Sequence, residues 1–263
     1  MQRADGSFLV ALARAAKARV KDGYYVTDRA RNRGRKSLSA ALRTQERIPI
    51  IAEVKFRSPS EGLIGRGEPD EIARAYERGG AAAISVLTEP GNFGGSLASL
   101  SAVAGCVNLP VLMKDVVVDP IQIKAAALYG ADATLLIAGI FSSGLAGASM
   151  NEMMYSAHSE NLEVVVEVHD EKEFDAALGG RADVVGINNR DLRTLTVSLE
   201  TSERLLRGSR RNKPVICESG IVEREDIIRL RALGADGFLI GSALMKSEDP
   251  EAALKELSMV GPR

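Results

Sequence analysis

Several polar side chains stand at or just beyond the ends of apolar segments that are typical of buried strands. The candidates for catalysis are Glu53, Lys55, Lys114, Glu167, Asn188 and Glu218. A single charge in such a place is more often half of a structural ion pair, but five charges converging on one face favour function. Two lysines with three carboxylates suit acid–base catalysis, because a pocket can shift both pKa values toward neutrality.

An internal repeat indicates how these side chains are brought together. The segment Pro110–Lys114, followed by Gly130-Ala-Asp, recurs as Pro214–Glu218, followed by Gly234-Ala-Asp. Glycine follows proline by 20 residues in each copy, and the copies are 104 residues apart. If four strand–helix units separate them, each unit has 26 residues, and eight units fit within the 263 residues of the chain. The spacing predicts an eight-stranded parallel barrel, whose chemistry lies at the carboxyl ends of its strands.

The predicted fold is a single α/β domain over residues 1–263, a (β/α)8 TIM barrel with an N-terminal helical extension over residues 1–47. Near-continuous apolar runs are expected in a parallel sheet that is buried on both faces. The predicted strands are Ile48–Val54, Ala82–Leu87, Pro110–Met113, Ala133–Ile137, Glu163–Val168, Asp183–Ile187, Pro214–Cys217 and Gly237–Ile240. Asp119-Pro120 predicts the start of a helix between two of them.

The composition excludes several classes of function. A net charge of −1 gives no reason to expect nucleic-acid or membrane binding. The basic residues between Arg29 and Lys36 are interpreted as a solvated connector, followed by a helix over residues 37–47. Two cysteines and two histidines, without ligand spacing, predict no metal site. No signal or membrane segment is recognised, so a cytoplasmic protein is expected.

Small residues after the last two predicted strands indicate a phosphate site. Ser219-Gly220 and Gly241-Ser242 occupy the positions at which barrels of this kind bind phosphate through backbone N–H groups. The sequence alone therefore predicts a phosphorylated small-molecule ligand.

The motifs in these strand-end segments resemble indole-3-glycerol phosphate synthase from about residue 37 to the end of the chain. The segments that carry the resemblance are Glu53-Val-Lys55-Phe-Arg-Ser58-Pro59-Ser60, Val111-Leu-Met-Lys114-Asp115 and Gly186-Ile-Asn188-Asn-Arg190-Asp191-Leu192. The family closes the indole ring of 1-(2-carboxyphenylamino)-1-deoxyribulose 5-phosphate, with loss of carbon dioxide and water. The resemblance implies that no metal or organic cofactor is needed.

The resemblance also assigns roles to residues. Lys114 would protonate the ribulose carbonyl, and Glu167 would act as base in the dehydration. Lys55 would contact substrate anions from the first loop and serve as a second proton donor. Glu53 and Glu218 would hold the lysines and substrate hydroxyls, while Asn188 would orient the sugar. The expected substrate-binding residues are Ser58, Pro59, Phe93, Leu135, Arg190, Leu192, Ser219, Gly220, Leu239, Ile240, Gly241 and Ser242.

One departure from the family and two alternatives remain open. Val116 stands where phenylalanine is common, which puts the packing of the aryl ring in doubt. Another phosphosugar barrel enzyme, such as phosphoribosylanthranilate isomerase, would be expected to carry a Cys/Asp pair instead of Glu53 and Lys55. A non-catalytic barrel that binds a phosphorylated ligand is disfavoured by Lys114 and Glu167. The expected assembly is a monomer or a weak homo-oligomer.

Overall fold

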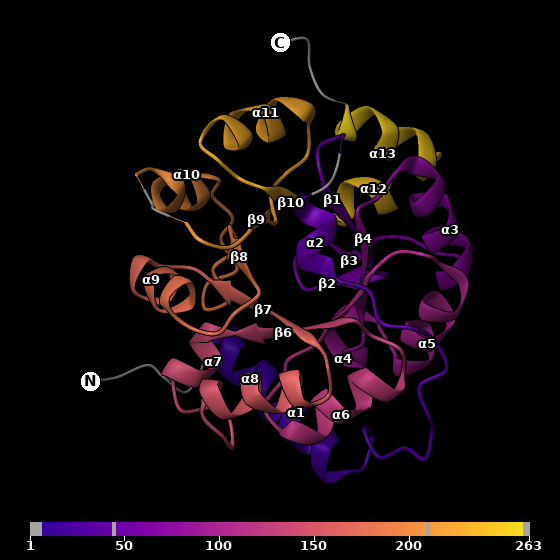
Figure 1. The fold of residues 1–263 in the computed structure, drawn as a ribbon, viewed down its shortest axis with the longest axis vertical. Helices are drawn as coiled ribbons and strands as arrows, with labels where there is room; N and C mark the ends of the chain where they lie inside the picture. Colours follow the sequence, from indigo (N-terminus) through magenta and orange to yellow (C-terminus); the bar gives the residue numbers. More distant parts are fainter. Residues whose placement is uncertain (1–6, 44–45, 209–210, 260–263) are drawn as a thin grey trace.

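Eight parallel strands close into a barrel in the computed structural model, which describes residues 7–43, 46–208 and 211–259 (Figure 1). The barrel strands are β1 Ile50–Val54, β4 Ala83–Leu87, β5 Val111–Lys114, β6 Ala133–Ile137, β7 Glu163–Val168, β8 Val184–Asn188, β9 Val215–Glu218 and β10 Gly237–Ile240. Each pairs in parallel with its neighbours in chain order, and β10 closes the ring onto β1. All eight strands are confirmed, with ends within two residues of the prediction.

Helices surround the barrel and alternate with its strands (Figure 1). They are α3 Pro69–Gly79, α5 Leu97–Cys106, α6 Pro120–Leu128, α8 Met150–Ser159, α9 Glu171–Gly179, α10 Glu200–Leu206, α11 Arg224–Ala232 and α13 Pro250–Ser258. Short elements follow some strands: β2 Arg57–Ser58, β3 Gly62–Leu63, α4 Pro90–Phe93, α7 Ala138–Ser142 and α12 Ser242–Met245. As predicted, α6 starts at Pro120, and its N-cap Asp119 accepts the N–H of Ile121.

The inside of the barrel is built from alternate residues of each strand, because successive side chains point to opposite faces. Ile51, Leu112, Val165, Ile216 and Leu239 pack together as the inner core. The intervening side chains pack outward against the helices. Two residues beyond these inner positions come Glu53, Lys114, Glu167, Glu218 and Gly241. The alternation therefore carries the polar side chains onto the inner face at the carboxyl end of the barrel.

The N-terminal segment covers both ends of the barrel with two helices. The longer helix, α1 Phe8–Lys21, buries Leu9, Leu12, Ala13 and Ala16 in the inner core. The shorter helix, α2 Leu38–Arg43, buries Leu38 and Leu42 beneath the start of the strands. The prediction of helix over residues 37–47 was wrong in extent, because α2 ends at Arg43; residues 44–45 lie outside the described residues. The segment between the two helices is not helical.

The basic segment between α1 and α2 is not the solvated connector that was predicted. Arg31 and Arg33 bind the buried carboxylate of Asp132 at 2.6 and 3.3 Å, and their side chains are only 13% and 11% exposed. Arg31 and Arg35 also donate to the carbonyl of Ala131. Asp132 directly precedes β6, so the segment straps the end of the barrel at which strands begin. Periodicity could not reveal this pairing, which joins residues about 100 positions apart.

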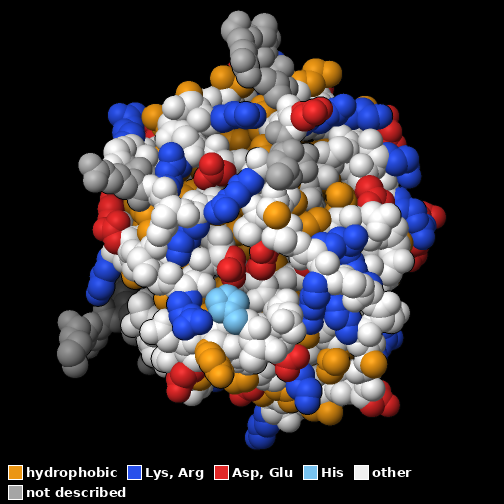
Figure 2. All heavy atoms as spheres, in the orientation of Figure 1, with side chains coloured by type: hydrophobic (Ala, Val, Ile, Leu, Met, Phe, Trp, Pro, Cys, Tyr) orange, Lys and Arg blue, Asp and Glu red, His pale blue; other side chains and the backbone are white. Residues whose placement is uncertain are grey.

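Charges of both signs are interspersed over the face of the molecule on which α2 lies (Figure 2). No helix within the described residues is both long and apolar enough to cross a membrane.

Candidate active site

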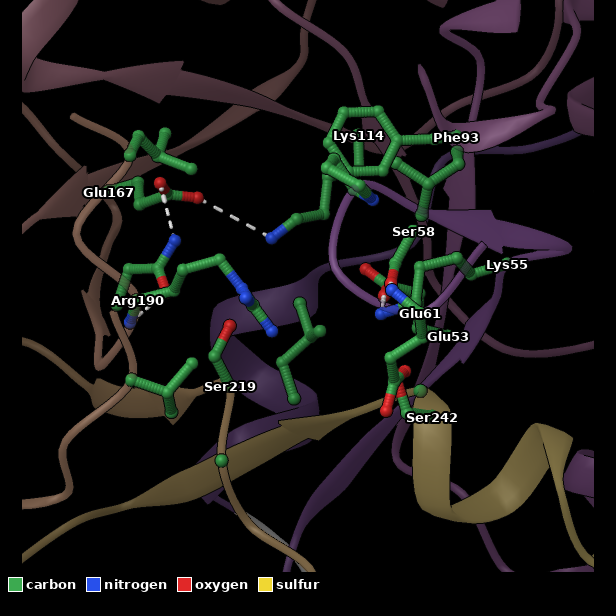
Figure 3. A pocket seen from close by; sticks show the side chains of 18 of the residues that line it. Glu53, Lys55, Ser58, Glu61, Phe93, Lys114, Glu167, Arg190, Ser219 and Ser242 are labelled. Atoms are coloured by element: carbon green, nitrogen blue, oxygen red, sulfur yellow. Dashed lines mark hydrogen bonds and ion pairs between the residues drawn. The ribbon is translucent and has the colours of Figure 1, made fainter. Parts of the chain in front are cut away.

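A cavity of about 370 Å³ opens at the carboxyl ends of the barrel strands (Figure 3). It is lined by five of the six predicted catalytic residues and by all twelve predicted substrate-binding residues. Glu218 is the exception: its carboxylate lies behind Lys114 and does not line the cavity. The structure thus brings the predicted side chains to one place, with Glu218 in a supporting position.

Lys114 is surrounded by carboxylates that are almost wholly buried. Its Nζ lies 2.5 Å from Glu218 Oε2 and 3.4 Å from Glu167 Oε2, and these side chains are 1% and 4% exposed. Figure 3 shows Lys114 and Glu167 reaching toward each other across the pocket. The barrel holds Glu218 tightly because β8 has Gly186 beside it, where any side chain would overlap with the Glu218 carboxylate.

The charged side chains in this cluster shift one another's pKa values. Burial by itself would lower the pKa of Lys114, but the charges of Glu218, Glu167 and Glu53 outweigh it and raise the pKa above its usual value. Burial raises the pKa of Glu218 to about 7, a shift opposed by Lys114 and reinforced by Glu167. Lys114 is therefore a firmly protonated donor, and Glu218 retains a proton to higher pH than an ordinary carboxylate does.

Glu53 and Lys55 form a second pair at the end of β1. Lys55 Nζ lies 2.9 Å from Glu53 Oε1, so the two side chains point the same way. Burial would raise the pKa of Glu53, but Lys55 and Lys114 outweigh it and lower the pKa. The absence of a side chain at Gly241 leaves space for the Glu53 carboxylate. Glu53 thus stays charged and interacts electrostatically with both Lys55 and Lys114.

Asn188 holds the other side of Glu167. Its side-chain amide donates to Glu167 Oε1 at 2.8 Å, and its Oδ1 accepts the backbone N–H of Arg190 at 2.9 Å. The imidazole Nδ1 of His169 lies 2.9 Å from the Asn188 carbonyl oxygen and fixes the strand end. His169 was not predicted as a site residue, because its contact is to a backbone atom.

The predicted anion-binding residues meet at one side of the cavity. Ser219 and Gly220 form a left-handed turn after β9, with φ values of 64° and 75°, and the Asn189 amide donates to the Ser219 carbonyl. Gly241 follows β10 as the N-cap of α12, and Ser242 is the first residue of that helix. Figure 3 shows Ser219 and Ser242 on the same side of the pocket, away from Glu167.

Two further charged residues, Glu61 and Lys246, lie beside the predicted anion-binding residues and were not predicted from the sequence. Glu61 accepts hydrogen bonds from Ser242 Oγ at 2.9 Å and from Lys246 Nζ at 2.8 Å. Ser58, predicted to bind phosphate, lines the cavity but uses its hydroxyl to accept the N–H of Glu61. Neither Glu61 nor Lys246 ends a strand, so the rule that found the other residues did not reach them.

The opposite wall of the cavity is apolar. Val116, the predicted departure from the family resemblance, is 3% exposed and packs with Leu135 and Ile137. Phe8 and Leu12 of α1 line the cavity beside them and were not predicted. Other predicted substrate-binding residues with apolar side chains also line the cavity, namely Pro59, Phe93, Leu192, Leu239 and Ile240. The N-terminal helix therefore supplies apolar surface on the side where Val116 is small.

A buried polar network ties α1 to this wall. Arg19 donates to Glu89 at 2.7 Å, and Glu89, the N-cap of α4, accepts the N–H of Phe93, the last residue of that helix. Asp115, next to Lys114, accepts from Thr88 Oγ1 at 2.7 Å and from the Tyr25 hydroxyl at 3.0 Å. These contacts hold the N-terminal helix in a fixed position relative to the strand that carries Lys114.

Within the described part of the chain, no group of His, Cys, Asp and Glu side chains is arranged to hold a metal ion. The carboxylates of the pocket are instead arranged around lysine ammonium groups. Such a pocket can donate a proton from an ammonium, accept one at a carboxylate and bind an anion at the opposite side.

Comparison with known protein structures shows the barrel fold. Thiamine phosphate pyrophosphorylase from Pyrococcus furiosus aligns with a TM-score of 0.58 and 19% identity, over 80% of this chain and 93% of that chain. The N-acetylmannosamine-6-phosphate 2-epimerase from Clostridium perfringens aligns with a TM-score of 0.61 and 16% identity, over 82% and 94% of the two chains. At these identities the likeness extends to the fold alone.

Sequence comparison is more specific. The family model for indole-3-glycerol phosphate synthase matches residues 11–257. The enzyme of that name from Hyphomonas neptunium is 44% identical over 81% of this chain and 80% of its own length. Its counterpart from a Geobacillus species is 42% identical over 87% and 90% of the two chains. On this match, and with the strand-end motifs gathered in one pocket, the chain belongs to the indole-3-glycerol phosphate synthase family.

Proposed function

We propose that the chain converts 1-(2-carboxyphenylamino)-1-deoxyribulose 5-phosphate to indole-3-glycerol phosphate, as a carboxy-lyase of its family. The observation that carries this proposal is the pocket around Lys114, in which a protonated lysine faces the carboxylate of Glu167 between an apolar wall and an anion-binding side. The substrate has matching parts: an aryl ring, a carbonyl to be protonated and a phosphate.

Lys114 is proposed as the acid of ring closure. When the aryl carbon bearing the carboxylate attacks the ribulose carbonyl carbon, a carbon–carbon bond forms and the carbonyl oxygen takes a proton from the Lys114 ammonium. Loss of carbon dioxide then removes the carboxylate from the ring. Glu218 and Glu53 support this step, because their charges keep Lys114 protonated until the carbonyl oxygen needs the proton.

Glu167 and Lys55 are proposed to complete the dehydration. The hydroxyl formed in the first step leaves as water after protonation, and a second proton must be removed to make the indole ring aromatic. Glu167 is placed to accept that proton, held by the Asn188 amide at 2.8 Å. Lys55 lies in the cavity beside Glu53 and can protonate the leaving hydroxyl.

The phosphate is proposed to bind among Ser219, Gly220, Gly241 and Ser242, with Lys246 as an additional cation. This side of the cavity combines exposed backbone with a hydroxyl and an ammonium. The aryl ring would then lie against Phe93, Leu135 and Leu192, with the guanidinium of Arg190 beside the sugar. The substrate therefore spans the pocket from the anion site to the apolar wall.

The proposal extends to the domain organisation, location and assembly of the protein. The chain is proposed to act as one domain, in the cytoplasm, as a monomer or weak homo-oligomer, with no cofactor and no nucleic acid. The pairing of Arg31 and Arg33 with Asp132 supports the last point, since these cations are already bound within the protein.

The proposal is tested by turnover. Purified protein is mixed with the carboxyphenylamino-deoxyribulose phosphate, and formation of the indole chromophore is followed by fluorescence. Steady production of indole-3-glycerol phosphate is the expected result. Thermal stabilisation by the substrate without product would contradict it and would favour a non-catalytic barrel. If the protein gave no product and was not stabilised by the substrate, the result would point to a different phosphosugar ligand.

A further inference from the structure

A carboxylate of the protein itself is held at the anion-binding side of the cavity. Glu61 lies on the two-stranded turn formed by β2 and β3, which follows barrel strand β1. Its oxygens accept hydrogen bonds from Ser242 Oγ at 2.9 Å and Lys246 Nζ at 2.8 Å. All three side chains line the cavity. The loop is bonded to the barrel at the place proposed for the substrate phosphate.

A phosphate at this place would need the same donors. The hydroxyl of Ser242 has a single proton, so it cannot donate to Glu61 and to a phosphate oxygen together. The ammonium of Lys246 has three protons, but a phosphate bound to it would lie against the negative charge of Glu61. The hydrogen bond from Lys246 lowers the pKa of Glu61, so the carboxylate is charged at neutral pH. The two anions therefore compete for these donors.

We propose that Glu61 is a built-in competitor for the substrate phosphate, which must displace this carboxylate from Ser242 and Lys246 to bind. The inference rests on the phosphate site of the proposed function. A phosphate dianion brings more charge to Lys246 than a carboxylate does, so substrate displaces Glu61 where singly charged anions compete poorly. Displacement also releases the β2–β3 turn, whose loop begins at Lys55.

Replacing Glu61 by glutamine removes the charge and keeps the size of the side chain. The Glu61→Gln variant is expected to lower the KM for substrate and the inhibition constant of inorganic phosphate together, by about 1.4- to 5-fold, which is the range for a partly exposed ion pair. The turnover number is expected to stay the same, because Glu61 does not contact the Lys114–Glu167 pair. A change in binding without a change in turnover distinguishes competition from a structural role.

The matched control is Glu68→Gln. Glu68 is exposed on the same loop, caps no backbone N–H with its side chain and carries the same charge, so it reports any general effect of removing one negative charge. A second variant, Lys246→Met, is expected to weaken inhibition by phosphate and thereby locate the anion.

The outcomes separate the inference from the proposed function. Tighter phosphate binding in Glu61→Gln, with Glu68→Gln like the parent, supports the inference. If Glu61→Gln left the KM and the phosphate inhibition constant unchanged while Lys246→Met bound phosphate more weakly, the competitor role of Glu61 would be overturned. The proposed place of the phosphate would still stand. If Lys246→Met bound phosphate as the parent does, both the competitor role and the placement of the phosphate would be wrong.

Discussion

Replacing Lys114 by methionine should destabilise the protein in a way that depends strongly on pH. Methionine is close to lysine in length but has no charge, so the substitution leaves Glu218, Glu167 and Glu53 together without the cation they surround. Removing one partner of a buried ion pair costs about 3–5 kcal/mol. We expect a loss of free energy of unfolding in that range at pH 8.

The sign of the pH dependence follows from Glu218. Its pKa is raised from 4.5 to about 7 in the folded protein, so it favours folding in acid, and this contribution is lost as the pH rises through 7. At about 1.4 kcal/mol for each unit of pKa, the parent loses roughly 3 kcal/mol from this group between pH 4.5 and pH 8. Without Lys114, which opposes the shift, the loss in the variant should be larger. The destabilisation should therefore shrink toward pH 5.

Urea unfolding followed by circular dichroism at pH 5.5 and pH 8 measures this difference. The double variant Lys114→Met/Glu218→Gln removes both charges and should recover about 3 kcal/mol relative to Lys114→Met at pH 8. A Lys114→Met protein as stable as the parent at pH 8 would refute the reasoning. So would an equal destabilisation at both pH values, because burial of the unpaired carboxylates would then not be the cause.

Three other substitutions test separate parts of the account. Glu167→Gln keeps the shape and removes the base, so steady-state kinetics should show turnover reduced about 10²- to 10⁴-fold; an unchanged rate would rule out the dehydration role. Gly186→Ala places a methyl group against the Glu218 carboxylate, so urea unfolding should show a loss of about 1–3 kcal/mol, together with reduced turnover. Asp132→Asn leaves Arg31 and Arg33 without their shared buried carboxylate and should cost about 3–5 kcal/mol. The Asp132→Asn variant is expected to turn over substrate like the parent at low temperature. Stability equal to that of the parent would contradict the structural role of the Arg31 and Arg33 pairing with Asp132.

Much of the barrel was predictable because its signals are local and repeat. Apolar runs of four to seven residues, the Asp119 cap and the left-handed Gly80 after α3 act within one unit of the chain. The candidate site followed from one rule, that polar residues at the ends of apolar strands converge on one face of a parallel barrel. This rule placed Lys114 and Glu167 in one cavity before any contact between them was known.

What the sequence did not reveal depends on contacts between distant segments. Arg31 pairs with Asp132 about 100 residues away, and Glu61 meets Ser242 across 181 positions. No periodic pattern encodes such pairs, and a charged residue in a loop has no signature that separates a bound side chain from a solvated one. The position of Phe8 in the cavity lining was missed for the same reason. The sequence predicts an N-terminal helix, but it does not reveal the surface against which that helix is buried.

The most direct test of the central claim compares the parent with Lys114→Ala in the indole fluorescence assay, after circular dichroism has shown that both are folded at the assay pH. The account predicts indole-3-glycerol phosphate from the parent and no detectable product from the variant, because the carbonyl oxygen would have no proton donor. Product from the folded variant at a rate near that of the parent would contradict the account and remove Lys114 from the acid role.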